Sequence, residues 1–554
     1  MKHPNASHTE FNQTPSLEEY NLFTTDLALQ EAVQREGAGA AAPDLGCAGA
    51  ALGTAANFEH ARLANRHAPV LHNFNVQGER IDSIEFHPSW HALMQGIAAR
   101  GYHAEPWARV DGRSVAGAHA ARAAGYLMQA QVECGTLCPT TMTYGAIAAM
   151  RRDAWLEREW VSRLVTREYD ARDIPIEHKR GGLIGMGMTE KQGGSDVRAN
   201  SSRALRSADG TYRITGHKWF FSAPQCDAHL VLAQTDGGLS CFFMPRRLPD
   251  GTLNGIYIQR LKDKLGNRSN ASSEVEFIDA WAHPTGEEGR GIPTILEMGT
   301  YTRLDCVTGT AGMMRQAVVQ AVHHAHHRKV FGALLINQPL MQSVLADLAI
   351  ESEAATALAM RLARAFDSDA DSEIALRRAL TSAAKFWVCK RGCELAAEAM
   401  EVLGGNGYTE EMHLARMARE MPVNSIWEGS GNIMCLDVLR AFAKSTSTRD
   451  VVLHELSAAR GRHRNFDAAY ERFAATIATP ATSEAHARRF TQMFVTLMQG
   501  GLLLSAATNL GASAVADAFC ATRLCAEAGW GAVFGASGTA LDVDVILDRA
   551  WIEN

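Results

Sequence analysis

Between residues 181 and 285 the chain changes from helix-like to strand-like sequence, and this change constrains the fold more than any other feature. Short runs rich in β-branched and aromatic residues, such as 230–233, 241–244 and 275–277, are separated by Gly, Asp and Asn at intervals of about ten residues. Regularly spaced short strands are typical of a small antiparallel β-domain. We therefore expect such a domain in the middle of the chain.

Sequence on both sides of this region is helical. Ala-rich segments before it and long segments after it carry apolar residues at i, i+3 and i+4, the spacing of one helix face. The expected fold is mainly α with a central antiparallel β-domain. Its expected parts are an N-terminal arm (1–30), a helical domain (31–180), the β-domain (181–285), a second helical domain (286–444) and an extra C-terminal helical domain (445–554). A chain of 554 residues is long enough for several domains.

The composition excludes several classes of protein. With 46% hydrophobic and 21% charged residues, it is that of an ordinary soluble globular protein. The net charge of -7 gives no overall basic field for nucleic acid. The first residues contain no apolar segment of the signal-peptide type, and the eleven scattered cysteines suit free thiols in a reducing compartment. We expect a cytoplasmic protein that does not associate with a membrane.

Common nucleotide and metal motifs are absent or incomplete in the sequence. Residues 185–190 begin like a dinucleotide-binding loop but lack the third glycine, and there is no P-loop and no Gly-x-Ser-x-Gly elbow. Cys134 and Cys138 stand four apart without a second pair at metal-ligand spacing. The histidines within 323–327 form pairs that arise easily on an ordinary helix, so we expect no metal site.

Six short motifs follow one another along the chain, and their order carries more information than any one of them. They are the glycine-rich loop 187–196, the aromatic segment 216–222, the segment 264–269, the segment 328–332 with Gln338, the glycine turn 403–408 and the segment 424–434. The last contains Glu428 between Trp427 and a Gly-Ser-Gly turn. Desolvation raises the pKa of a carboxyl group in such a setting and makes it a proton acceptor near neutral pH. The alternative is a solvated glutamate in a turn between two helices.

In this order of motifs the chain resembles the acyl-CoA dehydrogenase family, over about residues 50–445. More narrowly, the chain looks like the AidB branch, which belongs to the adaptive response to DNA alkylation. Four features carry this likeness: the N-terminal arm, the Met-Thr-Glu-Lys-Gln-Gly-Gly-Ser-Asp loop, the sequence around Glu428 and the helical C-terminal tail. The resemblance implies helical, β and helical domains that hold FAD without a Rossmann fold. It also implies an oxidoreductase acting on the CH–CH bond of acyl-CoA, and a homotetramer.

The resemblance implies roles for residues of the middle domain. Met188 and Thr189 would line the pyrimidine side of the flavin, with Thr189 hydrogen-bonded to it, and Ser195 lies in the same loop. Phe220 stands where the family usually has a Trp stacked on the isoalloxazine. Ser222 stands where it usually has a Thr near the reactive flavin nitrogen. Both replacements keep the character of the position, an aromatic face and a hydroxyl.

Residues after the middle domain are implied to bind the rest of the cofactor. Arg328 would pair with the FAD pyrophosphate of a neighbouring subunit, since a guanidinium matches two phosphate oxygens at once. An ordinary surface arginine is the alternative. The other implied cofactor contacts are Phe331, Gln338, Gly404, Gly405, Asn406, Trp427, Ser430 and Asn432.

Glu428 aligns with the family's catalytic base. An acyl thioester loses its α-proton to a carboxylate while a hydride leaves the β-carbon for the flavin. Some relatives carry the base at another position, which is Thr302 here, and a threonine cannot serve. Trp427 is larger than the Tyr usual at its position and would narrow the pocket. This favours a short branched acyl-CoA or another small hydrophobic electrophile over a long acyl chain.

The C-terminal region is basic only in its first half. Residues 441–490 contain eight Lys and Arg against five Asp and Glu, and the residues from 491 onward contain two against six. The resemblance implies that this region binds double-stranded DNA, where phosphate contacts dominate affinity. The candidate contacts are Arg440, Arg460, Arg462 and Arg464. A solvated helix face explains the same charges.

Two functions follow from these observations. The first is an FAD protein that protects DNA from alkylation, with weak dehydrogenation of a short branched acyl-CoA. The alternative is a metabolic acyl-CoA dehydrogenase or oxidase with no DNA role.

Overall fold

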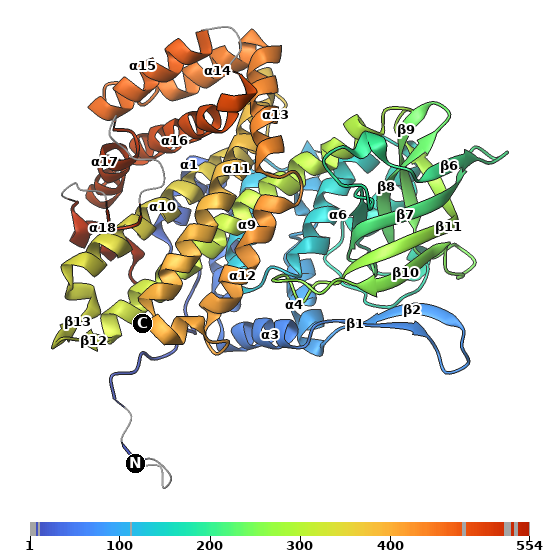
Figure 1. Cartoon of the computed structure of the whole chain (residues 1–554), viewed down its shortest axis with the longest axis horizontal. Coiled ribbons are helices and arrows are strands. Elements are labelled where there is room, and N and C mark those ends of the chain that lie inside the picture. The colour runs from blue at the N-terminus through green and yellow to red at the C-terminus, as the bar shows by residue number, and fades with distance from the viewer. Residues whose placement is uncertain are drawn as a thin grey trace. The chain divides into compact units, whose positions relative to one another are not determined.

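The chain forms two compact units, whose elements are labelled in Figure 1. The computed structural model describes residues 7–8, 11–110, 113–478, 483–525, 533–536 and 541–552. The first unit comprises residues 1–54, 307–425 and 434–554, and the second comprises residues 55–306 and 426–433. Among the described residues, no helix is both long and apolar enough to cross a bilayer.

The second unit is built on a seven-stranded sheet with the order β10-β11-β9-β8-β5-β7-β6. Its strands are β5 (Ile184–Gly187), β6 (Arg203–Arg206), β7 (Tyr212–Ser222), β8 (Ala228–Thr235), β9 (Gly238–Pro245), β10 (Ile256–Leu261) and β11 (Ser272–Thr285). The predicted β-domain is confirmed, and strands joined by short turns pair antiparallel.

Most strand pairs of the sheet are antiparallel, as expected, but β5 and β6 each pair in parallel with β8. A short turn forces adjacent strands to run in opposite directions, whereas a longer connection allows either direction. β5 leads into the long loop 188–202 rather than into a hairpin turn. The sheet is therefore mixed.

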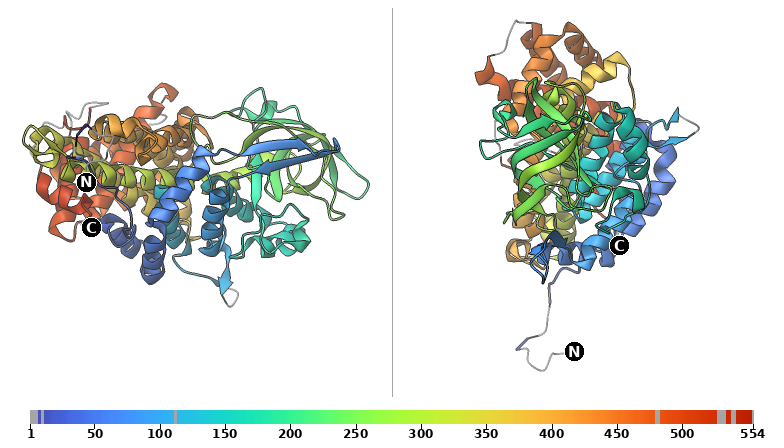
Figure 2. Two further views of the ribbon diagram at one scale, coloured as in Figure 1. Left: turned by 90° about the horizontal axis from the view of Figure 1, so that it is seen from below. Right: turned by 90° about the vertical axis from the view of Figure 1, so that its right-hand side faces the viewer.

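Helices and two hairpins precede this sheet in the second unit. The helices are α3 (Ala55–Arg66), α4 (Pro88–Ala99), α5 (Ala118–Val132), α6 (Leu137–Met150), α7 (Ala154–Leu156) and α8 (Ser162–Leu164). The hairpins pair β1 (Val70–Phe74) with β2 (Arg80–Glu85) and β3 (Arg109–Val110) with β4 (Arg113–Ser114). Figure 2 shows β1 and β2 alongside the sheet, where Asn73 Nδ2 donates to Ile258 O across 2.8 Å. Sequence patterns missed the first hairpin because β1 has no buried side chain and so no apolar alternation.

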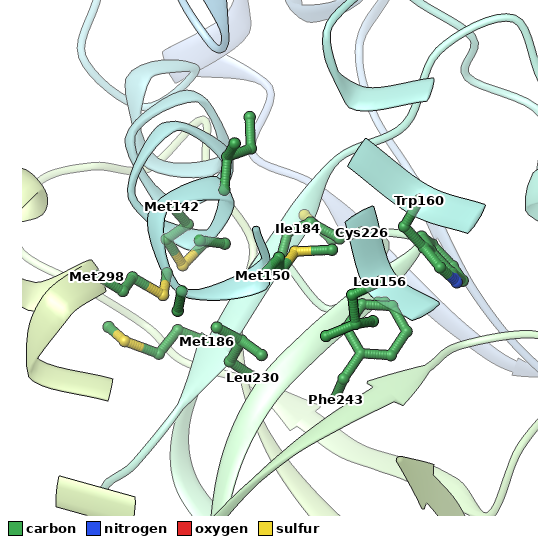
Figure 3. Close-up of a cluster of buried hydrophobic side chains, with 14 of the residues drawn as sticks. Met142, Met150, Leu156, Trp160, Ile184, Met186, Cys226, Leu230, Phe243 and Met298 are labelled. Carbon is green, nitrogen blue, oxygen red and sulfur yellow. The ribbon is translucent and has the colours of Figure 1, made fainter. Parts of the chain in front are cut away.

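A hydrophobic core joins the helices and the sheet within the second unit. Figure 3 shows side chains of this cluster, among them Met142 of α6, Ile184 and Met186 of β5, and Leu230 of β8. β8 is buried along most of its length, which explains its continuous apolar sequence. Burial of such side chains stabilises the fold by roughly 1.5–3 kcal/mol each. The core therefore fixes the end of β5, from which the glycine-rich loop 188–196 begins.

The first unit is helical apart from one short hairpin. Its elements up to residue 444 are α1 (Leu27–Arg35), α2 (Ala42–Leu52), the later part of α9 (Gly291–His327), β12 (Lys329–Val330), β13 (Ala333–Leu334), α10 (Pro339–Arg364), α11 (Asp371–Val402), α12 (His413–Ile426) and most of α13 (Gly431–Lys444). Pro339 occupies the first turn of α10, where no backbone donor is needed. Gly404 takes a φ of 62° after α11, a left-handed value that ends a helix at little cost in glycine.

The C-terminal helices of the first unit are α14 (Thr446–Ser457), α15 (Arg464–Ala478), α16 (Ala487–Ala506), α17 (Leu510–Arg523) and α18 (Val543–Ala550). Helices α14, α16, α17 and α18 pack on α10 or α11, and α15 packs on α16. Ion pairs reinforce this packing: Arg361 of α10 pairs with Glu455 of α14 across 2.6 Å, and Arg523 of α17 pairs with Asp347 of α10 across 2.7 Å.

The N-terminal arm docks on its own chain. Its buried side chains include Leu17, Tyr20, Leu22 and Phe23. Tyr20 Oη donates to Gln316 Oε1 of α9 across 2.6 Å. Helix α9 of the same chain therefore supplies the docking surface for Tyr20. Phe11, in contrast, is 78% exposed.

Candidate active site

Glu428 lies in the turn between α12 and α13 in an unusual backbone conformation. Its φ is 58°, a left-handed value that costs a non-glycine residue about 1–3 kcal/mol. Two neighbouring residues of α9 hold it: Thr302 Oγ1 donates to Glu428 Oε2 across 2.7 Å, and Arg303 Nε donates to the Glu428 main-chain oxygen across 2.9 Å. Glu428 is therefore a half-buried carboxylate in a fixed position, not a freely solvated one.

The part of α9 that carries Thr302 is itself anchored. Asp305, one helical turn further on, accepts hydrogen bonds from Arg122 Nη1 and Nη2 across 2.6 and 2.7 Å and from Thr141 Oγ1 across 2.5 Å. The Arg122 guanidinium also lies 3.5 Å from the centroid of the Tyr144 ring. Arg122 and Asp305 are both buried, so the charges are paired out of water in bidentate geometry. Sequence reasoning missed this pair because its two residues lie far apart in the chain.

The buried thiol of Cys138 is affected by the charge of Glu428. Burial raises the pKa of Cys138 to about 12; Lys264 opposes this change and the carboxylate of Glu428 adds to it. The thiol is therefore a neutral group at physiological pH.

Lys264 binds groups next to Ser222. Its Nζ donates to the main-chain oxygen of Asn270 across 2.7 Å and to Ser272 Oγ across 3.0 Å, and Ser272 Oγ lies 3.2 Å from Ser222 Oγ. The motif 264–269 was found by sequence, but no role was assigned to its lysine. Its contacts give it one, which is to fix the strand end that carries Ser222.

The glycine-rich loop is tied to the sheet by a buried ion pair. Glu190 and Lys218 are fully buried, with Lys218 Nζ 2.8 Å from Glu190 Oε1. Burial raises the pKa of Glu190, but the charge of Lys218 and hydrogen bonds from the loop outweigh it and lower the pKa to about 2. Trp219 N donates to Thr189 O across 2.8 Å, which fixes Thr189 beside β7.

Close packing within the loop requires glycine at one position. A Cβ atom on Gly194 would lie 2.5 Å from Thr189 Oγ1, which is too close for any larger residue. Of the other predicted loop residues, Met188 packs against the core shown in Figure 3, and Ser195 is exposed.

Phe220 presents its ring outward from β7. The ring is 51% exposed, whereas the adjacent Phe221 is in the core. Lys262 Nζ lies 4.6 Å from the Phe220 ring centroid and 3.4 Å from that of Trp219. A large exposed aromatic side chain held beside a fixed cation is available to stack on a planar ligand.

Arg328 lies where α9 ends and the hairpin β12–β13 begins. The two-residue turn of this hairpin consists of Phe331 at φ 50° and Gly332 at φ 85°. Such turns favour glycine or asparagine, so a phenylalanine there is strained. Phe331 is also fully exposed. Phe331 thus combines a strained backbone conformation with a solvent-exposed aromatic ring.

The other predicted cofactor contacts lie on the surface or near it. Gln338 is half-buried, with its Nε2 3.4 Å from Val330 O of the same hairpin. The turn formed by Gly404, Gly405 and Asn406 is exposed, as are Ser430 and Asn432. Trp427 is half-buried and packs against the core of the second unit. That these residues contact FAD stays a prediction.

The four candidate DNA contacts differ in their surroundings. Arg460 pairs with Glu471 across 2.7 Å, and Arg462 Nη1 donates to Leu504 O across 2.9 Å. Arg440 and Arg464 are exposed, and no described residue forms a hydrogen bond or ion pair with either side chain. The densest basic segment is therefore partly engaged within the fold.

Three family descriptions match successive parts of the chain. They are the adaptive response protein AidB N-terminal domain over residues 12–171, the acyl-CoA dehydrogenase middle domain over residues 185–280, and the acyl-CoA dehydrogenase C-terminal domain over residues 289–443. Together they cover most of the chain, in the order that the motifs predicted.

Individual proteins show the same relationship. The chain is 51% identical to AidB of Escherichia coli (strain K12) over 94% of each sequence. Its fold is similar to that of Caenorhabditis elegans ACDH-11 in complex with C11-CoA, with a TM-score of 0.82 and 25% identity over 95% of each chain. It also shares its fold with an acyl-CoA dehydrogenase complexed with FAD from Bacillus anthracis, with a TM-score of 0.66 and 18% identity over 78% of this chain and 80% of that one.

The fold and the site thus define an acyl-CoA dehydrogenase. Within that family, the chain belongs to the AidB branch. Members of the family are FAD-dependent oxidoreductases that act on acyl-CoA.

The residues present suit FAD. Phe220 supplies an exposed aromatic face, and Thr189 and Ser222 supply hydroxyls for hydrogen bonding. The loop is closely packed at Gly194, which allows its backbone to approach a ligand closely. A flavin needs each of these. When bound, FAD would supply an acceptor for a hydride.

Proposed function

We propose that this protein oxidises a short branched acyl-CoA, with FAD as acceptor and Glu428 as catalytic base. The observation that carries this proposal is the position of Glu428, whose carboxylate is fixed by Thr302 and whose backbone is held in a left-handed turn between α12 and α13. A base must be both fixed and near the acceptor, because proton and hydride leave neighbouring carbons of one substrate.

Glu428 would take the α-proton of the thioester, and the electrons of that C–H bond would form the α,β double bond. Bound FAD would supply the acceptor for the hydride that leaves the β-carbon. The organic product would be an enoyl-CoA, with the proton on Glu428. Thr302 orients the carboxylate through its hydrogen bond, and Arg303 holds the main chain of the same residue.

Residues of two subunits would hold the cofactor in a homotetramer. Phe220 would stack on the isoalloxazine, and Met188, Thr189, Ser195 and Ser222 would contact its polar edge. Ser430 and Asn432 would flank FAD beside Glu428. Arg328, Phe331, Gln338 and the turn at Gly404, Gly405 and Asn406 would reach the FAD of a neighbouring subunit. The strained and exposed Phe331 supports this part of the proposal.

Trp427 supports a small acyl group. The indole packs against the hydrophobic core and adjoins Glu428, so it takes space beside the base. The C11-CoA complex of the Caenorhabditis elegans neighbour supports an acyl-CoA as the class of substrate. We propose a shorter, branched acyl group here, or another small hydrophobic electrophile.

Membership of the AidB branch supports a cytoplasmic role in protecting DNA from alkylation. Binding of double-stranded DNA would use Arg440 and Arg464 more than Arg460 and Arg462, because Arg460 pairs with Glu471 and Arg462 donates to Leu504 O. The second candidate is a metabolic acyl-CoA dehydrogenase or oxidase without a DNA role. The contacts of Arg460 with Glu471 and of Arg462 with Leu504 favour that candidate, because they account for part of the basic segment.

Anaerobic titration with short branched acyl-CoAs tests the catalytic proposal. Wild-type protein is expected to carry flavin absorbance and to lose it on reduction by the substrate. Glu428→Gln is expected to keep bound FAD and to be reduced at least about a hundredfold more slowly. Equal rates of reduction in the two proteins would refute the assignment of the base.

A salt titration of DNA binding tests the protective role. Each phosphate contact contributes about one unit to the slope of log affinity against log salt. The double variant Arg440→Gln/Arg464→Gln is expected to lower that slope, with Arg460→Gln as the matched control. Absence of salt-sensitive binding by the wild-type protein would favour the metabolic candidate.

A further inference from the structure

Asn12 of the N-terminal arm contacts both Arg328 and Lys329. Asn12 Nδ2 donates to Lys329 O across 2.8 Å, and Lys329 N donates to Asn12 Oδ1 across 2.7 Å. Arg328 Nη1 donates to the main-chain oxygen of Asn12 across 2.6 Å. One arm residue therefore binds both the backbone next to Arg328 and the guanidinium itself.

The two bonds from Asn12 lie on the outer edge of the hairpin β12–β13. Lys329 pairs with Leu334 across the hairpin, and Leu335 N donates to Arg328 O across 2.7 Å. The carboxamide of Asn12 binds Lys329 as a neighbouring strand would, with one donor and one acceptor. Lys329, the residue after Arg328, therefore has a partner on each side: Leu334 within the hairpin and Asn12 outside it.

Further contacts hold the arm along the last turns of α9. Thr14 Oγ1 lies 2.9 Å from His324 Nδ1, and His323 Nε2 lies 2.9 Å from Pro15 O. Asn12 has a φ of 55°, and asparagine is one of the few residues that adopt this value at modest cost. The backbone of the arm is thus shaped so that the Asn12 side chain faces Lys329.

Arg328 keeps one edge available for a ligand. Its Nη1 is directed to a neutral peptide oxygen, and no acidic side chain among the described residues pairs with it. A guanidinium has five donors, so Nε and Nη2 remain to bind two oxygens of an anion. A contact that fixes the plane of the guanidinium without neutralising it favours binding of a diphosphate.

We propose that Asn12 is a positioning residue of the cofactor site, and that the arm holds Arg328 in the orientation that binds the FAD pyrophosphate. This inference rests on the proposed contact between Arg328 and FAD. It extends the site to the arm, in which no cofactor residue was expected. Asn12 acts through Arg328 and does not itself touch the cofactor.

The test measures the dissociation constant of FAD from the full-length protein after removal and return of the cofactor. Asn12→Gly keeps the left-handed backbone and removes both side-chain bonds to Lys329. It is expected to weaken FAD binding about five- to tenfold, the effect of losing about one net hydrogen bond. Asn21→Ala is the matched control, because Asn21 Nδ2 donates to Gly46 O and its Oδ1 accepts from Phe23 N, so its side chain holds the arm at a place other than Arg328.

Asn21→Ala is expected to lower thermal stability while FAD affinity stays unchanged. An equal loss of FAD affinity in the two variants would overturn the inference, since it would show a general effect of loosening the arm. Unchanged affinity in Asn12→Gly would overturn it as well.

A double-mutant cycle separates this inference from the proposal on which it rests. Arg328→Lys is expected to weaken FAD binding, and Asn12→Gly is expected to add little in that background, because both act through one guanidinium. Additive effects would contradict positioning while leaving the Arg328 contact in place. If Arg328→Lys alone leaves FAD affinity unchanged, the pyrophosphate contact itself is wrong.

Discussion

Thr302 donates a hydrogen bond from its Oγ1 to Oε2 of Glu428 across 2.7 Å. The resemblance placed Thr302 at the position where some relatives carry their catalytic base. Here its hydroxyl contacts the carboxylate proposed as the base instead. Because the hydroxyl donates to one carboxylate oxygen, this bond orients the side chain of Glu428.

Replacement of Thr302 by valine tests this relationship. Thr302→Val removes the hydroxyl at nearly constant volume, so the carboxylate of Glu428 loses the bond that orients it, and we expect flavin reduction to slow about threefold to tenfold, the effect of about one net hydrogen bond. Thr300→Val is the matched control, since the Thr300 hydroxyl donates to Leu296 O on the same helix. Equal rates of flavin reduction in Thr302→Val and in the control would contradict the role of the hydroxyl.

The buried pair Glu190 and Lys218 predicts a strong stability effect at the base of the flavin loop. Glu190→Gln leaves the ammonium of Lys218 buried without its partner, and we expect a loss of about 3–5 kcal/mol in the free energy of unfolding. The double replacement Glu190→Leu/Lys218→Met is expected to cost less than the single one, because it leaves no buried charge. Chemical denaturation measures all three proteins; a double variant less stable than Glu190→Gln would refute the explanation.

The same pair predicts a direction for the effect of acid. The pKa of Glu190 is about 2 in the folded chain and 4.5 in the reference state. Its contribution to stability is therefore complete above pH 4.5 and is lost as the pH falls towards 2. Glu190→Gln should lack this part of the acid dependence.

His324 predicts that mild acid loosens the N-terminal arm. Burial, the charge of Arg328 and the neighbouring His323 and His327 lower the pKa of His324 from 6.5 to about 4. The unfolded chain therefore binds a proton here between pH 6.5 and 4 that the folded chain excludes, and stability falls as the pH is lowered through that window.

Hydrogen exchange of the arm amides measures this effect. Protection is expected to decline from pH 6.5 to 4 in the wild-type protein after correction for intrinsic rates. His324→Asn can hydrogen-bond Thr14 without titrating, so its arm should lose less protection over the same range. Identical declines in the two proteins would mean that another group is responsible.

The general architecture was predictable because it rests on local patterns. The period of the apolar residues distinguished helix from strand, and alternation along β7 places Phe221 in the core and Phe220 outside it. Turn chemistry identified Glu428, since glycines mark the sharp change of direction that follows it. These signals lie within a few residues of one another, so a single sequence contains them.

The residues that hold the site in place could not be predicted from local sequence patterns. Arg122 and Asp305 meet across 183 positions, and Asn12 meets Lys329 across 317. Nothing local distinguishes such residues from ordinary surface charges or amides. The parallel pairing of β5 with β8 escaped prediction for a similar reason, because strand direction depends on the path of a long loop rather than on the strand sequence.

The most direct test of the central claim is exchange of the substrate α-protons, because it isolates the action of the base. The substrate analogue is an acyl-CoA with α-hydrogens and a fully substituted β-carbon, such as the thioester of tert-butylacetic acid, which has no β-hydride to lose. In deuterated water the wild-type protein is expected to exchange the α-protons, and Glu428→Gln with FAD bound is expected to do so at least about a hundredfold more slowly. Exchange at equal rates, or none in the wild-type protein, would contradict the assignment of Glu428 as the base.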